Sequence, residues 1–329
     1  MGKGRVLALV SVISGFGAYT PKNSVSNDEL SQMIDTSDQW IRDRTGIESR
    51  FIADPLESTS SLGVEAAKAA ILDANISPKD IDLIVCATST PDKTFPATAA
   101  LIQAQIGANV GIAFDIQAVC SGFVYGMAVV DAMLKSGQAK NALLVGADTF
   151  SRILDWSDRG TSVLFGDGAG ACVMRAMDST KAEGKGVLAN VLRADGKYAD
   201  ILNVDSGASS GSRVGKLRME GQAVFRHAVT NISEAILTCC ERAGKTVDQI
   251  DWFVPHQANK RILDGVAKRL GISDDKVIMT VQIHGNTSAA SVPLAFDTAR
   301  KDGRIKAGDL VLLEAMGGGL TWGASLIQL

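Results

Sequence analysis

The chain has 329 residues, of which 46 % are hydrophobic and 21 % are charged, so it can build a full-sized core and is not expected to be disordered. Its 33 basic and 36 acidic side chains give a formal net charge of −3, which excludes a general nucleic-acid binder but allows a local basic patch. No apolar run approaches the ~18–20 residues that cross a bilayer, so no membrane span is expected. The short apolar run at residues 6–13 predicts a first strand rather than a signal peptide.

Five cysteines without a CxxC spacing do not make a disulfide framework, which indicates a reducing, cytoplasmic compartment. No two His or Cys residues fall at metal-ligand spacing, so no metal site is expected.

Short β-branched runs alternate with helical patterns, which is typical of a layered α/β protein. A helix is expected at residues 121–136, because apolar residues recur on one face from Phe123 to Leu134 and Gly137 would end it. Strands are expected at residues 81–87, 111–116, 142–145, 169–174, 252–255, 276–280, 310–313 and 323–328.

An internal repeat appears when the chain is compared with itself at an offset of 169 positions. Residues 80–85 then fall on 249–254, and Cys120 falls on Ala289. Two copies of an α/β unit, with halves at residues 1–178 and 179–329, would place a site at the seam between them. Residues 175–226 resemble an excursion from this repeat, and the Gly- and Ser-rich stretch 206–215 predicts a mobile surface loop.

Cys120 is a candidate nucleophile because it lies where a predicted strand passes into a helix. Backbone N–H groups at a helix N-terminus stabilise an anion and favour the reactive thiolate. The alternative is a small buried apolar side chain. The other cysteines are expected to be core residues (Cys86, Cys172) or helical residues without a metal pattern (Cys239, Cys240).

His256 and Asn286 are candidate partners of this cysteine. His256 lies at the end of a predicted strand, where catalytic groups gather in α/β folds. His284 precedes another helix, and His227 lies inside a helical run. The order Cys120, His256, Asn286 fits either a papain-like hydrolase, whose cysteine context is absent, or an acyl transferase in which His and Asn donate hydrogen bonds to an enolate oxygen.

Two glycine-rich clusters have different interpretations. Gly317, Gly318 and Gly319 follow a strand and could present a bare N–H to an oxyanion, or form an ordinary tight turn. Residues 166–170 precede a strand, which disfavours a dinucleotide fingerprint.

Basic residues on the helix after His256 are either a solvated surface or a docking face for an acidic partner: Lys260, Arg261, Lys268 and Arg269.

Several segments together resemble the β-ketoacyl-[acyl-carrier-protein] synthase III family of the thiolase superfamily, almost end to end. They are residues 35–41 with 44–47, the Cys120 segment, 158–161, 165–170, 254–259, 284–291, and 317–319 with 321–323. The resemblance implies an α/β fold, the duplicated five-layer α-β-α-β-α thiolase-like fold. It also implies an enzyme without metal or bound cofactor that acts as a homodimer.

The resemblance implies the condensation that initiates fatty acid biosynthesis. Cys120 would take the acyl group of an acyl-CoA primer, expected to be acetyl-CoA. His256 and Asn286 would then assist decarboxylation of malonyl-acyl-carrier protein, and the N–H groups of Cys120 and Gly318 would form the oxyanion hole. The alternatives are a related synthase of secondary metabolism with a longer or branched primer, a cysteine acyl hydrolase, and an inactive acyl-binding module.

The remaining roles also come from the resemblance. Coenzyme A is expected to contact Trp40, Arg44, Arg159 and Asn259. Phe95 is expected to reach into the acyl pocket of the partner subunit. The carrier protein is expected to dock on Arg226, Arg261, Lys268 and Arg269. The chain departs from the common family pattern at Gln117, Val119, Met316 and Leu320. These positions leave the length and branching of the primer open.

Overall fold

The core contains two sheets of similar plan, as the computed structural model describes them for residues 8–211 and 213–329. The first sheet has the order β1-β7-β6-β4-β5 and comprises β1 (Leu9–Tyr19), β4 (Leu83–Ala87), β5 (Ile112–Ile116), β6 (Asn141–Asp148) and β7 (Gly168–Asp178). The second has the order β11-β12-β13-β8 and comprises β8 (Gly186–Ala194), β11 (Trp252–Pro255), β12 (Leu310–Gly317) and β13 (Thr321–Gln328). In each sheet the parallel strands lie at one side and antiparallel strands complete the other.

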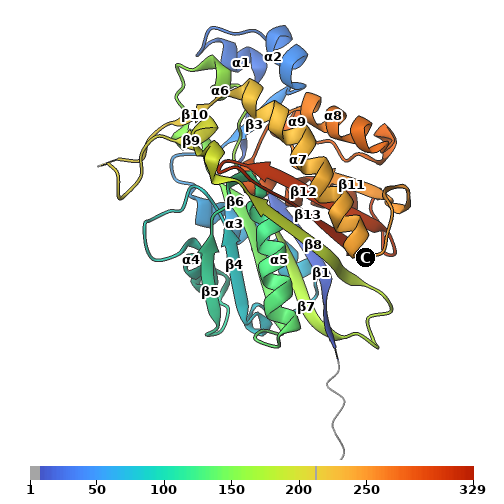
Figure 1. Cartoon of the computed structure of the whole chain (residues 1–329). Helices are drawn as coiled ribbons and strands as arrows, with labels where there is room; N and C mark the ends of the chain where they lie inside the picture. Colours follow the sequence, from blue (N-terminus) through green and yellow to red (C-terminus); the bar gives the residue numbers. More distant parts are fainter. Residues whose placement is uncertain (1–7, 212) are drawn as a thin grey trace, which may run out of the picture.

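Helices cover both sheets and also fill the space between them (Figure 1). The central layer consists of α5 (Gly122–Lys135) and α10 (Ser291–Lys301), whose Phe123 and Phe296 share one apolar cluster with strands of both sheets. The outer layers are α3 (Thr59–Asp73) with α4 (Thr98–Ile106), and α7 (Gly221–Arg242) with α8 (Lys260–Leu270). The expected five-layer α-β-α-β-α fold is therefore confirmed.

The central strands are buried on both faces, which explains their continuous apolar runs. Along β4, Leu83 and Val85 face the central helices, whereas Ile84 and Cys86 face α3 and α4. The first strand, expected at residues 6–13, starts at Leu9 and continues to Tyr19; residues 6 and 7 lie outside the described part. Gly17 is required there, because a Cβ atom would lie 2.3 Å from the backbone N of Ala70 in α3.

The repeat at an offset of 169 holds in the backbone conformation. Strands β6 and β12 correspond residue for residue at this offset, as do the one-turn 3-10 segments η2 (Val119–Ser121) and η7 (Ser288–Ala290). Val119 (φ 48°) and Ser288 (φ 53°), also 169 apart, both adopt the left-handed conformation that non-glycine residues rarely take. The same sharp turn therefore occurs once in each half.

Most expected elements lie where the patterns put them: β11 spans the expected residues 252–255, and the helix expected at 121–136 is η2 followed by α5, with Gly137 at a φ of 75° beyond its end. The strand expected at 276–280 is wrong. There the chain forms a 3-10 turn and one isolated bridge between Phe253 and Val277. The side chain of Gln257 accepts from the N–H groups of Thr280 and Val281 and so takes the place of a strand ladder.

The prediction that residues 175–226 depart from the repeat as an excursion is wrong in part. This segment contains β8, which pairs with β13 as the edge strand of the second sheet. The ribbon of β9 (Leu202–Val204) and β10 (Leu217–Met219) follows, and the described part of residues 206–215 is the connection between its strands. The smaller elements are β2 (Asn23–Ser26), α1 (Asn27–Ser31), α2 (Asp38–Thr45), β3 (Ser49–Ile52), α6 (Arg159–Ser162) and α9 (Val281–His284). Within the described ranges, no helix is long and apolar enough to cross a membrane.

Candidate active site

Cys120 lies in the turn η2, directly before α5, and its side chain is only 4 % exposed. No side chain caps the N-terminus of α5, so the partial positive charge of that helix end faces the cysteine turn. Gly317, at the end of β12, packs against the turn: a Cβ atom there would lie 2.6 Å from the backbone N of Cys120. Glycine is thus needed at position 317 for the two halves to meet.

Burial dominates the acidity of the Cys120 thiol and raises its pKa to about 12. The hydroxyl of Ser288 acts in the opposite direction, the carboxylate of Asp148 raises the pKa further, and the cysteine's own N–H lowers it. The resting site therefore holds a protonated thiol, and any reaction at sulfur must find a place for this proton.

Equivalent backbone N–H groups have different hydrogen-bond partners in the two halves. The N–H of Ala289 donates to Oδ2 of Asp148 (3.2 Å). Its counterpart 169 positions earlier is the N–H of Cys120, and the counterpart of Asp148 is Gly317, which has no side chain to accept a hydrogen bond. Within the described residues, the Cys120 N–H donates to no other residue. The N–H of Ala289 is therefore already hydrogen-bonded, whereas the equivalent N–H of Cys120 is a free donor beside the thiol.

His256 follows the last residue of β11 and is 5 % exposed. Its backbone N–H donates to the carbonyl oxygen of Glu314 on the neighbouring strand (2.9 Å), which anchors it at the carboxyl edge of the second sheet. Burial lowers the pKa of the imidazole to about 3, so the ring is neutral at physiological pH. Its Nδ1 atom has no hydrogen-bond partner among the described residues.

Asn286 is 6 % exposed and is held by backbone hydrogen bonds to Leu164 and Gly166 of the other half. Its Oδ1 atom accepts from the N–H of Ser288 (2.9 Å), which fixes the orientation of the amide. The amide NH₂ group, which donates to no described residue, is left as a potential donor to a ligand. Asn286 leads directly into η7, which packs against the Cys120 turn.

His284 is buried but lies outside this set, with its ring 5.9 Å from that of Phe51. Burial lowers its pKa to about 4. A histidine with a lowered pKa in the fold binds protons more readily when unfolded, so its contribution to stability is lost as the pH falls from about 6.5 towards 4.

His284→Gln should therefore lose less stability in acid than the wild type does. We expect the difference between the two free energies of unfolding to change by about 1.4 kcal/mol per pH unit between pH 6 and 4.5. Urea denaturation at a series of pH values measures this. His227→Gln, on a partly exposed face of α7, is the control. Parallel pH profiles for His284→Gln and the wild type would contradict the assignment.

The residues expected to contact coenzyme A lie together at the surface formed by α2, α6 and the start of α8. The guanidinium carbons of Arg44 and Arg159 lie 4.4 and 4.7 Å from the centre of the Trp40 ring. Asn259 caps α8, its side chain accepting from the N–H of Ile262, and α8 packs against α2. An aromatic ring in contact with two cations suits an anionic ligand with a flat ring system.

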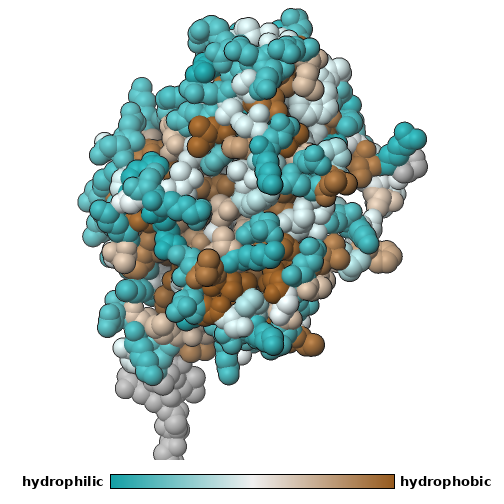
Figure 2. All heavy atoms as spheres, turned by 180° about the vertical axis from the view of Figure 1, so that it is seen from behind, coloured by the Kyte–Doolittle hydropathy of each residue, from teal (hydrophilic) through white to brown (hydrophobic). Residues whose placement is uncertain are grey.

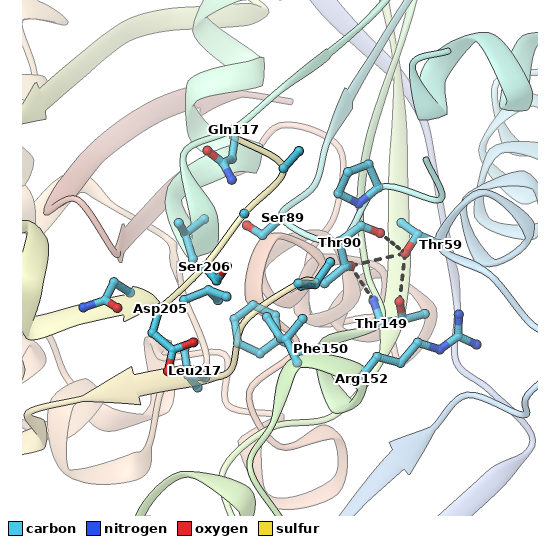
Figure 3. A pocket seen from close by; sticks show the side chains of 18 of the residues that line it. Thr59, Ser89, Thr90, Gln117, Thr149, Phe150, Arg152, Asp205, Ser206 and Leu217 are labelled. Atoms are coloured by element: carbon cyan, nitrogen blue, oxygen red, sulfur yellow. Dashed lines mark hydrogen bonds between the residues drawn. The ribbon is translucent and has the colours of Figure 1, made fainter. Parts of the chain in front are cut away.

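A cavity of about 1320 Å³ lies beside the Cys120 turn (Figure 3). Gln117 and Val119 form the wall nearest the cysteine, and Phe150, Leu202 and Leu217 supply apolar surface. The threonines at the rim are hydrogen-bonded to one another: Thr59 donates to the carbonyl oxygen of Thr90 (2.6 Å). Gln117 and Val119 were expected near the acyl pocket, but the rest of the lining was not predicted from the sequence, because these residues come from segments distant along the chain. Phe95 is not part of the lining; its side chain is 82 % exposed.

The basic residues expected to bind the carrier protein lie on the outer helices α7 and α8, which are side by side in Figure 1. All four are exposed and none forms an ion pair within residues 8–211 and 213–329: Arg226, Arg261, Lys268 and Arg269. By contrast, Lys260 is paired with Asp264 (2.7 Å). The four form an unneutralised basic face on an acidic protein. The same described ranges contain no group of three or more His, Cys, Asp or Glu side chains able to hold a metal.

The chain is similar to known proteins over nearly its whole length. The family described as 3-oxoacyl-[acyl-carrier-protein] synthase III matches residues 114–196, and its C-terminal counterpart matches residues 240–329. The β-ketoacyl-[acyl-carrier-protein] synthase III of Rhizobium meliloti is 58 % identical over 320 residues, which cover 97 % of this chain and 99 % of that protein. The chain belongs to the 3-oxoacyl-[acyl-carrier-protein] synthase III family.

Solved structures of the family superpose closely on the chain. The synthase III of Aquifex aeolicus has a TM-score of 0.92 at 44 % identity, covering 97 % of this chain and 100 % of that one. The priming β-ketosynthase of the R1128 polyketide pathway has a TM-score of 0.92 at 35 % identity, covering 99 % of each chain. Membership in this family confirms the resemblance seen in the sequence and sets the papain-like hydrolase aside. Asp148 and Ser288 were missed, although Asp148 could have been noticed as the counterpart of Gly317 in the repeat.

Proposed function

We propose that this member of the synthase III family initiates fatty acid biosynthesis. It condenses an acyl-CoA primer, acetyl-CoA, with malonyl-acyl-carrier protein and releases CoA, CO₂ and 3-oxoacyl-acyl-carrier protein. The observation that carries the proposal is the buried Cys120, with its free N–H, at the uncapped start of α5. The relatives named as synthase III at 58 % identity over nearly the whole chain support the reaction.

In the first half-reaction, the Cys120 sulfur attacks the thioester carbonyl carbon of the primer. The carbonyl oxygen becomes an oxyanion, which the N–H groups of Cys120 and Gly318 would stabilise. The C–S bond to CoA then breaks, and the acyl group stays on Cys120. The cavity beside Gln117 and Val119 would receive the acyl chain.

In the second half-reaction, loss of CO₂ from the malonyl group leaves an enolate. A neutral His256 and the NH₂ group of Asn286 suit this step, because both can donate a hydrogen bond to the enolate oxygen. The enolate carbon attacks the acyl-Cys120 carbonyl carbon, forming the new C–C bond and expelling the Cys120 thiolate. The adenine of CoA would bind at Trp40 and Arg159, its phosphates at Arg44, and its pantetheine arm near Asn259.

A homodimer belongs to the same proposal. Strand β5 is the edge of the first sheet, and no described strand pairs with its outer side. Its Ile112 is 38 % exposed and the nearby Phe95 is 82 % exposed. An apolar edge strand of this kind favours pairing with another chain. Phe95 would then reach the acyl pocket of the partner subunit. We also propose the division into halves at residues 1–178 and 179–329, and a reducing cytoplasmic location, which the five free buried cysteines suit.

The basic face on α7 and α8 would attract an acidic carrier protein. Arg261→Glu should raise the KM for malonyl-acyl-carrier protein by about threefold to tenfold and weaken its salt dependence, because rim charges act mainly on association. Transfer from acyl-CoA to Cys120 should change little. Lys185→Glu, an exposed charge reversal before β8, is the control. If Arg261→Glu leaves the carrier kinetics unchanged at low salt, the face is only solvated surface.

The experiment that tests the function is a panel of acyl-CoA primers assayed with malonyl-acyl-carrier protein. Acetyl-CoA should give the highest kcat/KM. Preference for a longer or branched primer would favour the alternative of a priming synthase in secondary metabolism, for which the R1128 enzyme is the structural precedent at lower identity. Absence of condensation with every primer would overturn the proposal.

A further inference from the structure

The proposed first half-reaction leaves the proton of the Cys120 thiol without an acceptor. His256 is poorly suited, since burial lowers its pKa to about 3. The dipole of α5 stabilises the thiolate but takes up no proton. Two buried polar groups next to Cys120 have no part in the mechanism so far: the hydroxyl of Ser288 and the carboxyl of Asp148.

Ser288 comes from η7, the turn that packs on the Cys120 turn, and it is completely buried. Its left-handed backbone (φ 53°) and the hydrogen bond from its N–H to Asn286 hold it in place. Its Oγ atom makes no hydrogen bond of normal geometry with any described residue. The hydroxyl nevertheless lies against both the Cys120 thiol and the Asp148 carboxyl, and it lowers the pKa of each.

Asp148 ends β6 and is also completely buried. Its Oδ1 atom is crowded with donors from the segment after β4, among them the N–H of Ser89 (2.7 Å) and the hydroxyl of Thr90 (3.0 Å). Among the described residues, its Oδ2 atom accepts only the N–H of Ala289 (3.2 Å), so it has room for a second donor. Burial raises the pKa of this carboxyl above its ordinary value, which makes it a better proton acceptor than an exposed aspartate.

We propose that Ser288 and Asp148 form a proton relay that deprotonates Cys120 as it attacks the primer. The thiol proton passes to Oγ of Ser288, and the proton of that hydroxyl passes to Asp148. The new bond joins the Cys120 sulfur to the acyl carbon, and the bond from that carbon to the CoA sulfur breaks. The proton then returns through Ser288 to the departing CoA thiolate, which leaves as the free thiol.

The relay keeps the number of charges in the buried site constant. Negative charge moves from Asp148 to the reacting sulfur, so no extra ion is created in a medium of low dielectric constant. Within the described residues, Asp148 from β6 is the only charged side chain that acts on the Cys120 thiol, and His256 after β11 is neutral. Ser288 is thereby a catalytic residue, and Asp148 acts through it.

The inference rests on the proposed function, and its test separates the two. Single-turnover transfer from acetyl-CoA to Cys120 is followed by mass spectrometry between pH 6 and 8. The wild-type rate should be nearly independent of pH. Ser288→Ala should be about a hundredfold slower at pH 7, a typical loss for one general base, and its rate should rise with hydroxide. Thr287→Val removes a buried, unpartnered hydroxyl from the adjacent residue and should behave as the wild type does.

Asp148→Asn removes the final proton acceptor of the relay. Acylation of Cys120 should therefore become slower, although loss of the negative charge by itself lowers the pKa of the thiol. Faster acylation in Asp148→Asn, or equal rates in Ser288→Ala and Thr287→Val, would overturn the relay. If Asp148→Asn does not fold, Ser288→Ala decides. If the wild type takes no acyl group, the proposed function fails; the relay is then overturned if Ser288→Ala and the wild type are alkylated with the same pH profile.

Discussion

Cys120→Ser should abolish the acyl adduct that acetyl-CoA forms on the enzyme and should lower kcat for condensation by about 10⁴-fold or more, as expected when a catalytic nucleophile is lost. A serine hydroxyl is a much weaker acid than a thiol, and His256, with a pKa of about 3, is too weak a base to activate it. Mass spectrometry of the peptide containing residue 120 measures the adduct, and a coupled assay measures turnover.

Cys240→Ser, on α7 and outside the site, is the matched control and should keep both properties. Cys86 and Cys172 have no exposed surface and lie inside strands β4 and β7, so neither is expected to compete as a nucleophile. Finding the acyl group on Cys86 or Cys172 of the wild type would contradict the proposed mechanism.

His256→Ala and Asn286→Ala should still accept the acyl group but should decarboxylate malonyl-acyl-carrier protein about 10²–10³-fold more slowly, the usual loss when one donor to a developing oxyanion is removed. Decarboxylation should be slowed and acylation should not, because the two side chains donate hydrogen bonds to the enolate and have no role in the reaction of the thiol. Release of ¹⁴CO₂ from labelled malonyl-carrier measures the second step, and the Cys120 adduct measures the first.

His284→Ala is the control for a buried histidine outside the set. Decarboxylation at the wild-type rate in either variant would remove that residue from the enolate role. Loss of acylation in the same variants would instead assign them to the first half-reaction. It would then also weaken the relay through Ser288, because His256 would be needed for the thiol proton.

Patterns within the chain were enough to predict much of this architecture. The offset of 169 positions predicted a duplicated unit, and β6 and β12 follow it residue for residue. Cys120 was singled out because a strand passes into a helix at a small, turn-forming segment. Such features are local: alternation, apolar periodicity and turn residues depend on neighbours a few positions away.

Prediction from local sequence patterns failed at two segments whose structure depends on contacts with residues distant along the chain. The β-branched run at 276–280 looks like a strand, but the side chain of Gln257 takes its hydrogen bonds. The run at 186–194 was assigned to an excursion, although it completes the second sheet beside β13. In both segments, whether the residues form a strand of the sheet depends on which part of the chain lies beside them and supplies their hydrogen-bond partners.

The sequence by itself thus determined the fold class, the repeat and the candidate residues Cys120, His256 and Asn286. Only the tertiary structure decided what surrounds the reacting sulfur. The contact between Asp148 and Ala289 joins residues 141 positions apart, and the one between Gly317 and Cys120 joins opposite halves of the chain. No periodicity encodes such a pair, because it depends on how two sheets and their central helices pack. That packing places a hydroxyl and a carboxyl beside the thiol and leaves one backbone N–H free.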